Sequence, residues 1–305
     1  MPLRAYQQRA HDAVITHIKK SICTALIEAV TAAGKSHIIA AVAQSIYEMS
    51  NGKSVLCLAP SKELVEQNRE KYLATGNPAS MYSASAGRKC LKHPVVFGTP
   101  LTVKNATDKI AKNIAAVIID EAHGLTPTIK KIIDELRVYN PNLRVIGFTA
   151  TPYRLTSGYI YEIDDKGEPV EEANNPYFKY LLTRITGHEL IELGYITKPI
   201  IGDNVDSYDT KNITINRMGN FVQSELDKAT LGKGRLTSRI IADIVEKAQG
   251  RRGVMIFASS VKHAKECMES LPHGLSEIVT GDTPKKEREK TLKRFKAGEI
   301  KYLVN

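Results

Sequence analysis

The sequence Ala29-Val30-Thr31-Ala32-Ala33-Gly34-Lys35-Ser36 follows the apolar run Ile22–Ile27 and opens the long amphipathic stretch Lys35–Met49. A strand that leads through a turn into a helix can surround a phosphate group with the N–H groups of the helix amino end. Lys35 would neutralise the phosphate, and the Ser36 hydroxyl would bind Mg²⁺. Alanine at positions 29 and 32 departs from the usual glycine-rich pattern. The stretch favours a phosphate-binding loop, and an ordinary helix start without a ligand is the alternative.

Short apolar runs alternate with longer amphipathic stretches on both sides of this loop. Such alternation predicts an α/β fold, in which a doubly wound parallel sheet carries helices on both faces. The expected strands of the first domain are Ile22–Ile27, Val55–Leu58, Val95–Gly98, Ala115–Ile119 and Arg144–Phe148. The expected helices are Lys35–Met49, Lys62–Leu73, Leu101–Ile110 and Thr128–Val138.

The first domain is expected to cover residues 1–201, with a β-hairpin insertion at about 158–176 and a capped helix that begins after Thr186. The polar, aperiodic residues 202–235 read as an inter-domain connection with a short helix near Val222–Lys228. A second α/β series fills residues 236–305. Its expected helices are Thr237–Ala248, Val261–Ser270 and Pro284–Phe295, and its strands are Gly253–Ala258, Glu277–Val279 and Lys301–Val304. Because the sequence stops after a strand, we expect an incomplete second domain from a longer protein.

The composition of the 305 residues is that of an ordinary globular protein, with 42% apolar and 25% charged residues. Lys and Arg exceed Asp and Glu by 43 to 33, and this net charge of +10 favours a polyanionic partner. No apolar run approaches the roughly 20 residues of a membrane helix, and the amino terminus lacks a secretory signal. We therefore expect a cytoplasmic protein without a membrane partner. The four cysteines are widely spaced, and we expect all of them to be packed thiols.

Two carboxylates end the run Ala115–Ile119, in the sequence Asp120-Glu121-Ala122-His123. Carboxylates at the end of a buried strand are costly unless they bind a metal or move a proton. Asp120 suits a Mg²⁺ ligand, and Glu121 suits a general base that activates water. After the next strand comes Thr149-Ala150-Thr151-Pro152, whose hydroxyls can hydrogen-bond to His123 or to a carboxylate. A solvated loop and a proline-terminated turn are the alternatives for each segment taken alone.

In this order the segments resemble the motif set of a superfamily two DEAH-box helicase, and most closely that of the RadD-like bacterial DNA-repair helicases. The segments that carry the resemblance in the first domain are Leu3–Gln7, Ala29–Ser36, Ala59–Asn68, Phe97–Pro100, Asp120–His123 and Thr149–Arg154. In the second domain they are Gly253–Ala258 and Thr280–Pro284. The resemblance implies two RecA-like P-loop domains, the second of them truncated here.

The resemblance also assigns roles to individual residues. For the adenine base these are Arg4 and Gln7, and for the phosphates and Mg²⁺ they are Thr31, Ala32, Ala33, Gly34, Lys35, Ser36 and Asp120. Catalysis would use Lys35, Asp120 and Glu121, with His123, Thr149 and Thr151 coupling hydrolysis to movement. Pro60, Ser61, Lys62 and Thr99 would hold the backbone of a nucleic-acid strand.

The resemblance implies an ATP-dependent DNA helicase or translocase that acts on single-stranded or branched DNA in repair, with ATP and Mg²⁺ as cofactors. A single-strand-binding protein is a further partner that the resemblance implies. Motifs V and VI, which supply the arginine finger, do not occur in the 305 residues, so we expect them to hydrolyse ATP slowly by themselves. The alternatives are the motor subunit of a restriction system and a nucleotide-gated clamp that does not unwind duplex.

The basic segment Lys285–Lys301 has two interpretations. Its charges fit a solvated helix face with Glu–Lys pairs, and they also fit a rim that approaches nucleic acid, with Lys293 and Arg294 as test positions.

Overall fold

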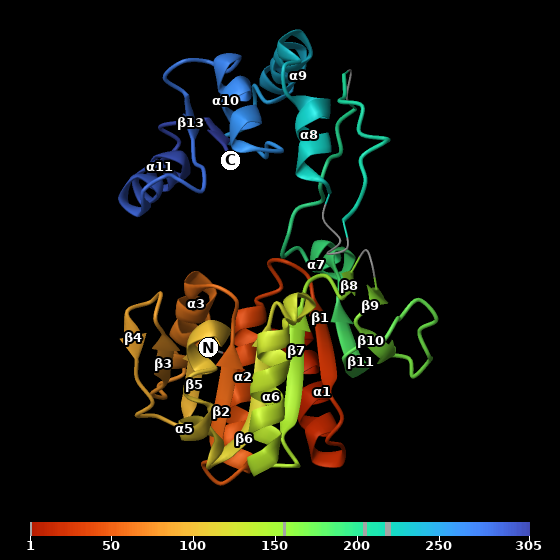
Figure 1. Cartoon of the computed structure of the whole chain (residues 1–305), viewed down its shortest axis with the longest axis vertical. Coiled ribbons are helices and arrows are strands. Elements are labelled where there is room, and N and C mark those ends of the chain that lie inside the picture. Colours follow the sequence, from red (N-terminus) through yellow and green to blue (C-terminus); the bar gives the residue numbers. More distant parts are fainter. Residues whose placement is uncertain (1, 155–156, 204–205, 217–220) are drawn as a thin grey trace. The chain divides into compact units, whose positions relative to one another are not determined.

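The computed structural model describes residues 2–154, 157–203, 206–216 and 221–305. The chain forms two compact units, Met1–Lys198 and Pro199–Asn305, which are described separately (Figure 1). Both are built from parallel strands and helices, so the predicted α/β class is confirmed.

The described part of unit 1 contains a nine-stranded sheet in the order β10-β11-β1-β7-β6-β2-β5-β3-β4. Neighbouring strands pair in parallel, apart from the antiparallel pair β3–β4. In sheet order, the strands are β10 (Tyr161–Ile163), β11 (Phe178–Ile185), β1 (Ala25–Ala29), β7 (Arg144–Thr149), β6 (Ile114–Asp120), β2 (Ser54–Leu58), β5 (Val95–Gly98), β3 (Ser80–Ser83) and β4 (Arg88–Lys89). The core strands β1, β7, β6 and β2 are almost wholly buried, as expected for strands covered on both faces.

Helices cover both faces of this sheet (Figure 1). One face packs against α1 (Ala5–Lys20), α2 (Lys35–Met49) and α3 (Lys62–Leu73). The other face packs against α4 (Pro100–Val103), α5 (Thr107–Ala111) and α6 (Pro127–Tyr139). The short helices η1 (Ala122–Gly124) and α7 (Gly187–Glu192) complete the unit, and the predicted cap of α7 is confirmed because Thr186 accepts a hydrogen bond from the N–H of Glu189.

Helix α1 was not predicted, although it buries one residue per turn. Its core-facing residues are Tyr6, Ala10, Val14 and Ile18. The prediction of one helix over Leu101–Ile110 was wrong, because Ala106 leaves the helical conformation and separates α4 from α5. The break allows both Val103 and Ile110 to be buried in the same core.

The residues predicted to form a hairpin insertion are joined to the main sheet. Strands β8 (Tyr153–Arg154) and β9 (Gly158–Tyr159) pair antiparallel, and Gly158 and Ile163 bridge to Ala173 and Pro169 on the returning arm. The chain reverses at residues 164–167, while β10 pairs in parallel with β11. The segment is therefore hairpin-like, but one of its arms is an edge strand of the sheet.

Unit 2 contains a three-stranded parallel sheet in the order β12-β14-β13, packed mainly against α9 and α10. Its elements are α8 (Gln223–Thr230), α9 (Gly234–Lys247), β12 (Val254–Ile256), α10 (Val261–Glu269), β13 (Ser276–Ile278), α11 (Lys285–Ala297) and β14 (Tyr302–Val304). Buried residues that include Ile241, Cys267 and Tyr302 form its small core.

Part of the predicted connection packs on unit 2. The hydroxyl of Tyr208 lies 2.9 Å from Thr237 Oγ1 and 3.0 Å from His263 Nε2, and Asp206 pairs with Arg239 at 2.7 Å. Residues 206–208 are thereby held against α9 and α10.

Two of the four cysteines differ from the expectation. Cys57 and Cys267 are buried, whereas Cys23 and Cys90 are exposed and so are not packed thiols. Among the described helices, none has the length and apolar character needed to cross a membrane.

Candidate active site

The predicted site residues meet at one edge of the sheet of unit 1. Strand β7 lies between β1 and β6, and all three run parallel. Their carboxyl ends therefore bring together the loop after β1, Thr149 at the end of β7 and Asp120 at the end of β6. In open α/β sheets this edge is where ligands bind.

The loop between β1 and α2 has the backbone of an anion-binding turn. Ala32 and Gly34 both adopt left-handed conformations, with φ of 72° and 76°. Successive N–H groups in such a turn, together with the unpaired N–H groups at the start of α2, form a concave surface for anions. The predicted loop therefore has the required shape despite its alanines.

Gln7 supports this loop from α1. Its Nε2 donates to the carbonyl oxygen of Ala33 at 2.9 Å, and its Oε1 accepts from the N–H of Arg4 at 3.0 Å. A Cβ atom at Gly34 would lie 2.5 Å from Gln7 Nε2 and would displace the Gln7 amide, and the φ of 76° also favours glycine there. The described role of Gln7 is thus to hold the loop, and its contact with adenine stays a prediction.

Lys35 links the two predicted halves of the site. Its Nζ lies 2.5 Å from Glu121 Oε1 and 3.6 Å from Asp120 Oδ1. The Lys35 side chain is only 15% exposed, so water screens these contacts weakly. One cation therefore balances two carboxylates at the place where a phosphate would compete for it.

Asp120 and Ser36 are positioned by polar residues of α3. The buried Asn68 donates from Nδ2 to Asp120 Oδ2 at 2.8 Å, and Gln67 Nε2 donates to Ser36 Oγ at 3.0 Å. The N–H of Glu121 donates to Asp120 Oδ1 at 2.9 Å. Within the described residues, the buried Asn68 Oδ1 has no hydrogen-bond partner.

His123 connects Glu121 to the end of β7. Its Nδ1 lies 2.9 Å from Thr149 Oγ1 and 3.3 Å from Glu121 Oε2. The N–H of Thr151 donates to Thr149 Oγ1 at 3.1 Å. The predicted hydrogen bond between His123 and a hydroxyl of this segment is confirmed.

Arg4 lies beside an aromatic pair from distant parts of unit 1. Its guanidinium carbon is 4.0 Å from the ring centroid of Tyr195, and Tyr195 meets Tyr6 edge to face with the centroids 5.4 Å apart. Tyr195 was missed because it is about 190 residues away in the chain and belongs to no motif.

Three of the four residues predicted to contact nucleic acid make hydrogen bonds or ion pairs within unit 1. The Thr99 hydroxyl is buried and lies 3.2 Å from Ser83 Oγ and 3.0 Å from Thr102 Oγ1. Ser61 caps α3 by accepting from the N–H of Leu64 at 3.3 Å, and Lys62 pairs with Glu66 at 3.5 Å. Pro60 is exposed.

The basic helix α11 has no buried residue, yet its arginines contact the rest of unit 2. Arg288 donates to the carbonyl of Thr280 at 2.7 Å, and Arg294 pairs with Glu277 and Glu299. Lys290 and Lys293 are exposed. Arg294 therefore stabilises the fold of unit 2, whereas these lysines face solvent, where both predicted interpretations place them.

Sequence reasoning also missed Asn68 as a site residue. Its signal was present, because α3 buries Val65, Asn68 and Tyr72 on one face. A polar residue on an otherwise apolar helical face needs a buried partner, and here that partner is Asp120.

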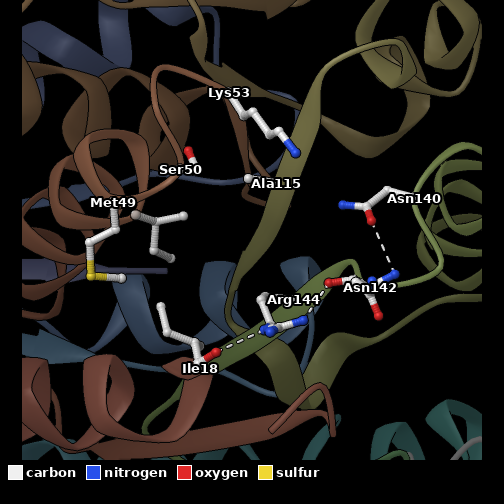
Figure 2. Close-up of a pocket in the computed structure, with 9 residues that line it drawn as sticks. Ile18, Met49, Ser50, Lys53, Ala115, Asn140, Asn142 and Arg144 are labelled. Atoms are coloured by element: carbon white, nitrogen blue, oxygen red, sulfur yellow. Dashed lines mark hydrogen bonds between the residues drawn. The ribbon is translucent and has the colours of Figure 1, made fainter. Parts of the chain in front are cut away.

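A cavity of about 290 Å³ lies at the opposite edge of the sheet, where the strands begin (Figure 2). Its lining includes Lys53, Asn140 and Arg144. Arg144 donates to the carbonyls of Ile18 at 3.0 Å and Asn142 at 2.6 Å, and so serves the last turn of α1 (Figure 2). This cavity is separate from the phosphate loop.

Two family models match the chain. The model described as "Type III restriction enzyme, res subunit" matches residues 1–154, half of the chain, and the model described as "Helicase conserved C-terminal domain" matches residues 236–305. The chain belongs to the superfamily two helicases, in the family of the first model. The predicted superfamily is therefore confirmed, and the large parallel sheet is the RecA-like sheet of this superfamily.

Curated relatives of this helicase-family chain include a phage protein and fungal helicases. The "51.5 kDa protein" of Lactococcus phage (isolate 7-9) is 26% identical over 291 residues, which cover 92% of this chain and 54% of that protein. The "ATP-dependent DNA helicase mph1" of Sclerotinia sclerotiorum is 30% identical over 159 residues, covering 48% of this chain and 13% of that protein. The chain thus spans about half the length of the phage relative and a much smaller part of the fungal one.

Solved structures share the fold at low identity. The "ATP-dependent Type ISP restriction-modification enzyme LlaBIII bound to DNA" matches all of this chain and 24% of its own, with a TM-score of 0.60 and 15% identity. The Pyrococcus furiosus Hef helicase domain matches all of this chain and 87% of its own, with a TM-score of 0.54 and 15% identity.

Proposed function

We propose that the chain is the motor of an ATP-dependent DNA helicase or translocase, of the DEAH type and related to the RadD-like repair helicases. The contact of Lys35 with both Asp120 and Glu121 carries this proposal, because it joins a phosphate-binding loop to a pair of catalytic carboxylates. Family membership supports the nucleotide-driven part, and the mph1 relative, named as a DNA helicase, supports DNA as the substrate.

The residues of the loop fit the phosphates of a nucleoside triphosphate. The left-handed turn at Ala32 and Gly34 and the amino end of α2 would hold the phosphates. Thr31, Ala33, Lys35 and Ser36 complete this loop, and Arg4 and Gln7 lie on the side proposed for adenine.

The same residues fit Mg²⁺. Ser36 and Asp120 offer hard oxygen atoms, and Mg²⁺ in such sites takes one or two protein ligands beside phosphate oxygens and water. The described residues contain no cluster of three or more His, Cys, Asp or Glu side chains that could bind a metal alone. Bound Mg²⁺ would neutralise negative charge on the phosphates.

The side chains then have distinct tasks in hydrolysis. Lys35 would move its charge from the carboxylates to the phosphates, which frees Glu121 to accept a proton from the attacking water. His123 lies next to Glu121 and bonds to Thr149, and these two residues would relay the state of Glu121 to the rest of the motor, together with Thr151.

For DNA, we propose single-stranded or branched substrates in repair, bound at Pro60, Ser61, Lys62 and Thr99. Thr99 is buried, its hydroxyl bonds to Ser83 and Thr102, and its N–H donates to the carbonyl of Tyr82, so a strand would contact it only after these bonds rearrange. A single-strand-binding protein is the proposed protein partner. We propose that the motor consists of a first domain at residues 1–201, a connection at 202–235 and a partial second domain at 236–305. We also predict that these 305 residues alone hydrolyse ATP slowly.

The test measures ATP turnover by the complete natural protein with and without single-stranded DNA. We expect DNA to stimulate turnover, and Lys35→Ala or Glu121→Gln to lower it at least about 100-fold. The proposal is contradicted if DNA does not change the rate of ATP turnover, or if neither substitution lowers that rate. Strand displacement then separates a helicase from a nucleotide-gated clamp.

The motor subunit of a restriction system is a second candidate, favoured by the family model whose description names a type III restriction enzyme subunit. It predicts ATP-dependent DNA cleavage when the protein is combined with its nuclease and methyltransferase partners. DNA repair defects in a deletion strain, without a change in phage restriction, favour the first candidate.

A further inference from the structure

Arg154 reaches from the short strand β8 to the turn that follows Asp120. Its Nε donates to the carbonyl oxygen of His123 at 2.7 Å, and its Nη2 donates to that of Leu125 at 3.2 Å. The residues it contacts are 29 and 31 positions away in the sequence. Two donors from one guanidinium fix both the position and the orientation of the turn.

The turn needs such support because it starts from an unfavourable backbone. Glu121 adopts a left-handed conformation, with φ of 51° and ψ of 49°. A residue with a Cβ atom holds this conformation only where its surroundings impose it. The 3-10 turn η1 follows at once, and Gly124 N–H donates back to the Glu121 carbonyl at 2.8 Å. Arg154 binds two of the carbonyl oxygens at the end of this turn, those of His123 and Leu125.

The charge of Arg154 is directed at this turn. Within the described residues Arg154 makes no ion pair with a carboxylate, and its guanidinium donates to these two carbonyl oxygens. Carbonyl groups at the end of a helical turn carry partial negative charge, which a cation stabilises. Glu121 and His123, whose side chains meet at 3.3 Å, are held by the same turn.

We propose that Arg154 is a positioning residue for nucleotide hydrolysis: it holds the turn that aims Glu121 and His123 at the phosphate site. This inference rests on the proposed function. Arg154 does not contact the phosphate loop in the described structure, so its loss should affect the chemical step more than the binding of nucleotide.

The kinetic test compares Arg154→Ala and Arg154→Lys with Arg144→Ala in the complete protein. Arg144 is a matched control, because it also donates to two backbone carbonyls of unit 1, but at the opposite edge of the sheet (Figure 2). For Arg154→Ala we expect kcat to fall about 10- to 100-fold, since small displacements of catalytic groups have effects of this size. KM for ATP should change less than about threefold. Arg154→Lys should retain part of the activity, and added guanidinium should raise the kcat of Arg154→Ala but not that of Arg144→Ala.

If the wild-type protein hydrolyses no ATP, the proposed function is overturned but the inference about Arg154 is not. A second measurement, which needs no hydrolysis, then tests that inference. Hydrogen exchange of the amides of residues 122–125, without nucleotide, should be at least about tenfold faster in Arg154→Ala and unchanged in Arg144→Ala. Unchanged exchange overturns the inference. So does a kcat within twofold of wild type, or an equal kcat loss in both alanine variants.

Discussion

At the scale of single residues, Lys35 decides the electrostatic balance of the site. It is the cation within 3.6 Å of both Asp120 and Glu121, and Asp120 is 4% exposed. Without Lys35 the two carboxylates would repel each other in a poorly hydrated site.

We therefore predict that Lys35→Met lowers the free energy of unfolding of the nucleotide-free protein by about 3 kcal/mol, because it strands a buried charge. Urea denaturation at neutral pH measures this change. The double variant Lys35→Met with Asp120→Asn should recover part of the loss. Equal stability of Lys35→Met and the wild type would show that the ion pairs are not stabilising.

At the scale of elements, the hairpin-like segment after β8 depends on Gly158. Gly158 has a φ of 70°, and a Cβ atom there would overlap the carbonyl oxygen of Glu172. Any side chain must therefore push the two arms apart. Because Gly158 pairs with Arg154 across β8 and β9, the disturbance would reach the strand whose Arg154 binds the turn after Glu121.

We predict that Gly158→Ala destabilises unit 1 by at least about 2 kcal/mol and lowers the rate of ATP turnover. Gly167→Ala is the control, since Gly167 also has a positive φ, of 89°, but has open space around its Cβ position. It should cost about 1 kcal/mol and leave turnover unchanged. Thermal unfolding and turnover measure both effects, and equal effects of the two substitutions would contradict the argument.

A buried histidine holds the segment around Tyr208 on unit 2. The N–H of Ser259 donates to His263 Nδ1 at 3.2 Å, so the proton of the neutral ring lies on Nε2, which faces the Tyr208 hydroxyl. Burial lowers the pKa of His263 below its ordinary value of 6.5, although Glu266 and Asp227 oppose the shift. Protonation would destroy the acceptor at Nδ1.

We predict that unit 2 loses stability as the pH falls from about 7 through 6.5 and below. The unfolded chain takes up this proton at a higher pH than the folded one, so acid favours unfolding. Thermal unfolding between pH 8 and 5.5 measures the effect. In His263→Asn the same decrease in pH should cause a smaller loss of stability. An identical pH dependence in the variant and the wild type would contradict the role of His263.

At the scale of the whole molecule, the reactivity of the four cysteine thiols tests whether the cores of both units are closed to solvent. Burial raises the pKa of the Cys267 thiol to about 11 and raises that of Cys57 further, whereas Cys23 and Cys90 are exposed. We predict that two thiols react with a disulfide reagent in the native protein and four in denaturant. Cys23→Ser with Cys90→Ser should abolish the native reaction. A third reactive thiol in the native protein would mean that one of the two cores is open, and a fourth that both are.

The sequence predicted those helices and strands well that bury a single face in one core. The bounds Lys35–Met49 and Lys62–Leu73 agree with α2 and α3, because both helices repeat apolar residues at helical spacing and end near polar residues. Strand β11 was missed, since its buried positions Phe178, Leu181 and Ile185 follow no strict alternation. The split of Leu101–Ile110 was missed because a break at Ala106 leaves no glycine or proline signal.

The sequence by itself predicted the strand, turn and helix around the loop Ala29–Ser36 and singled out Lys35, Asp120 and Glu121 as its candidate chemical groups. These are local features, set by spacing along the chain. The tertiary structure alone decided that β7 separates β1 from β6, so that Lys35 meets both carboxylates. It also decided that Thr99 turns inward and that Arg154 binds the turn after Glu121. Strand order and side-chain partners depend on contacts between distant segments, which periodicity along the chain does not encode.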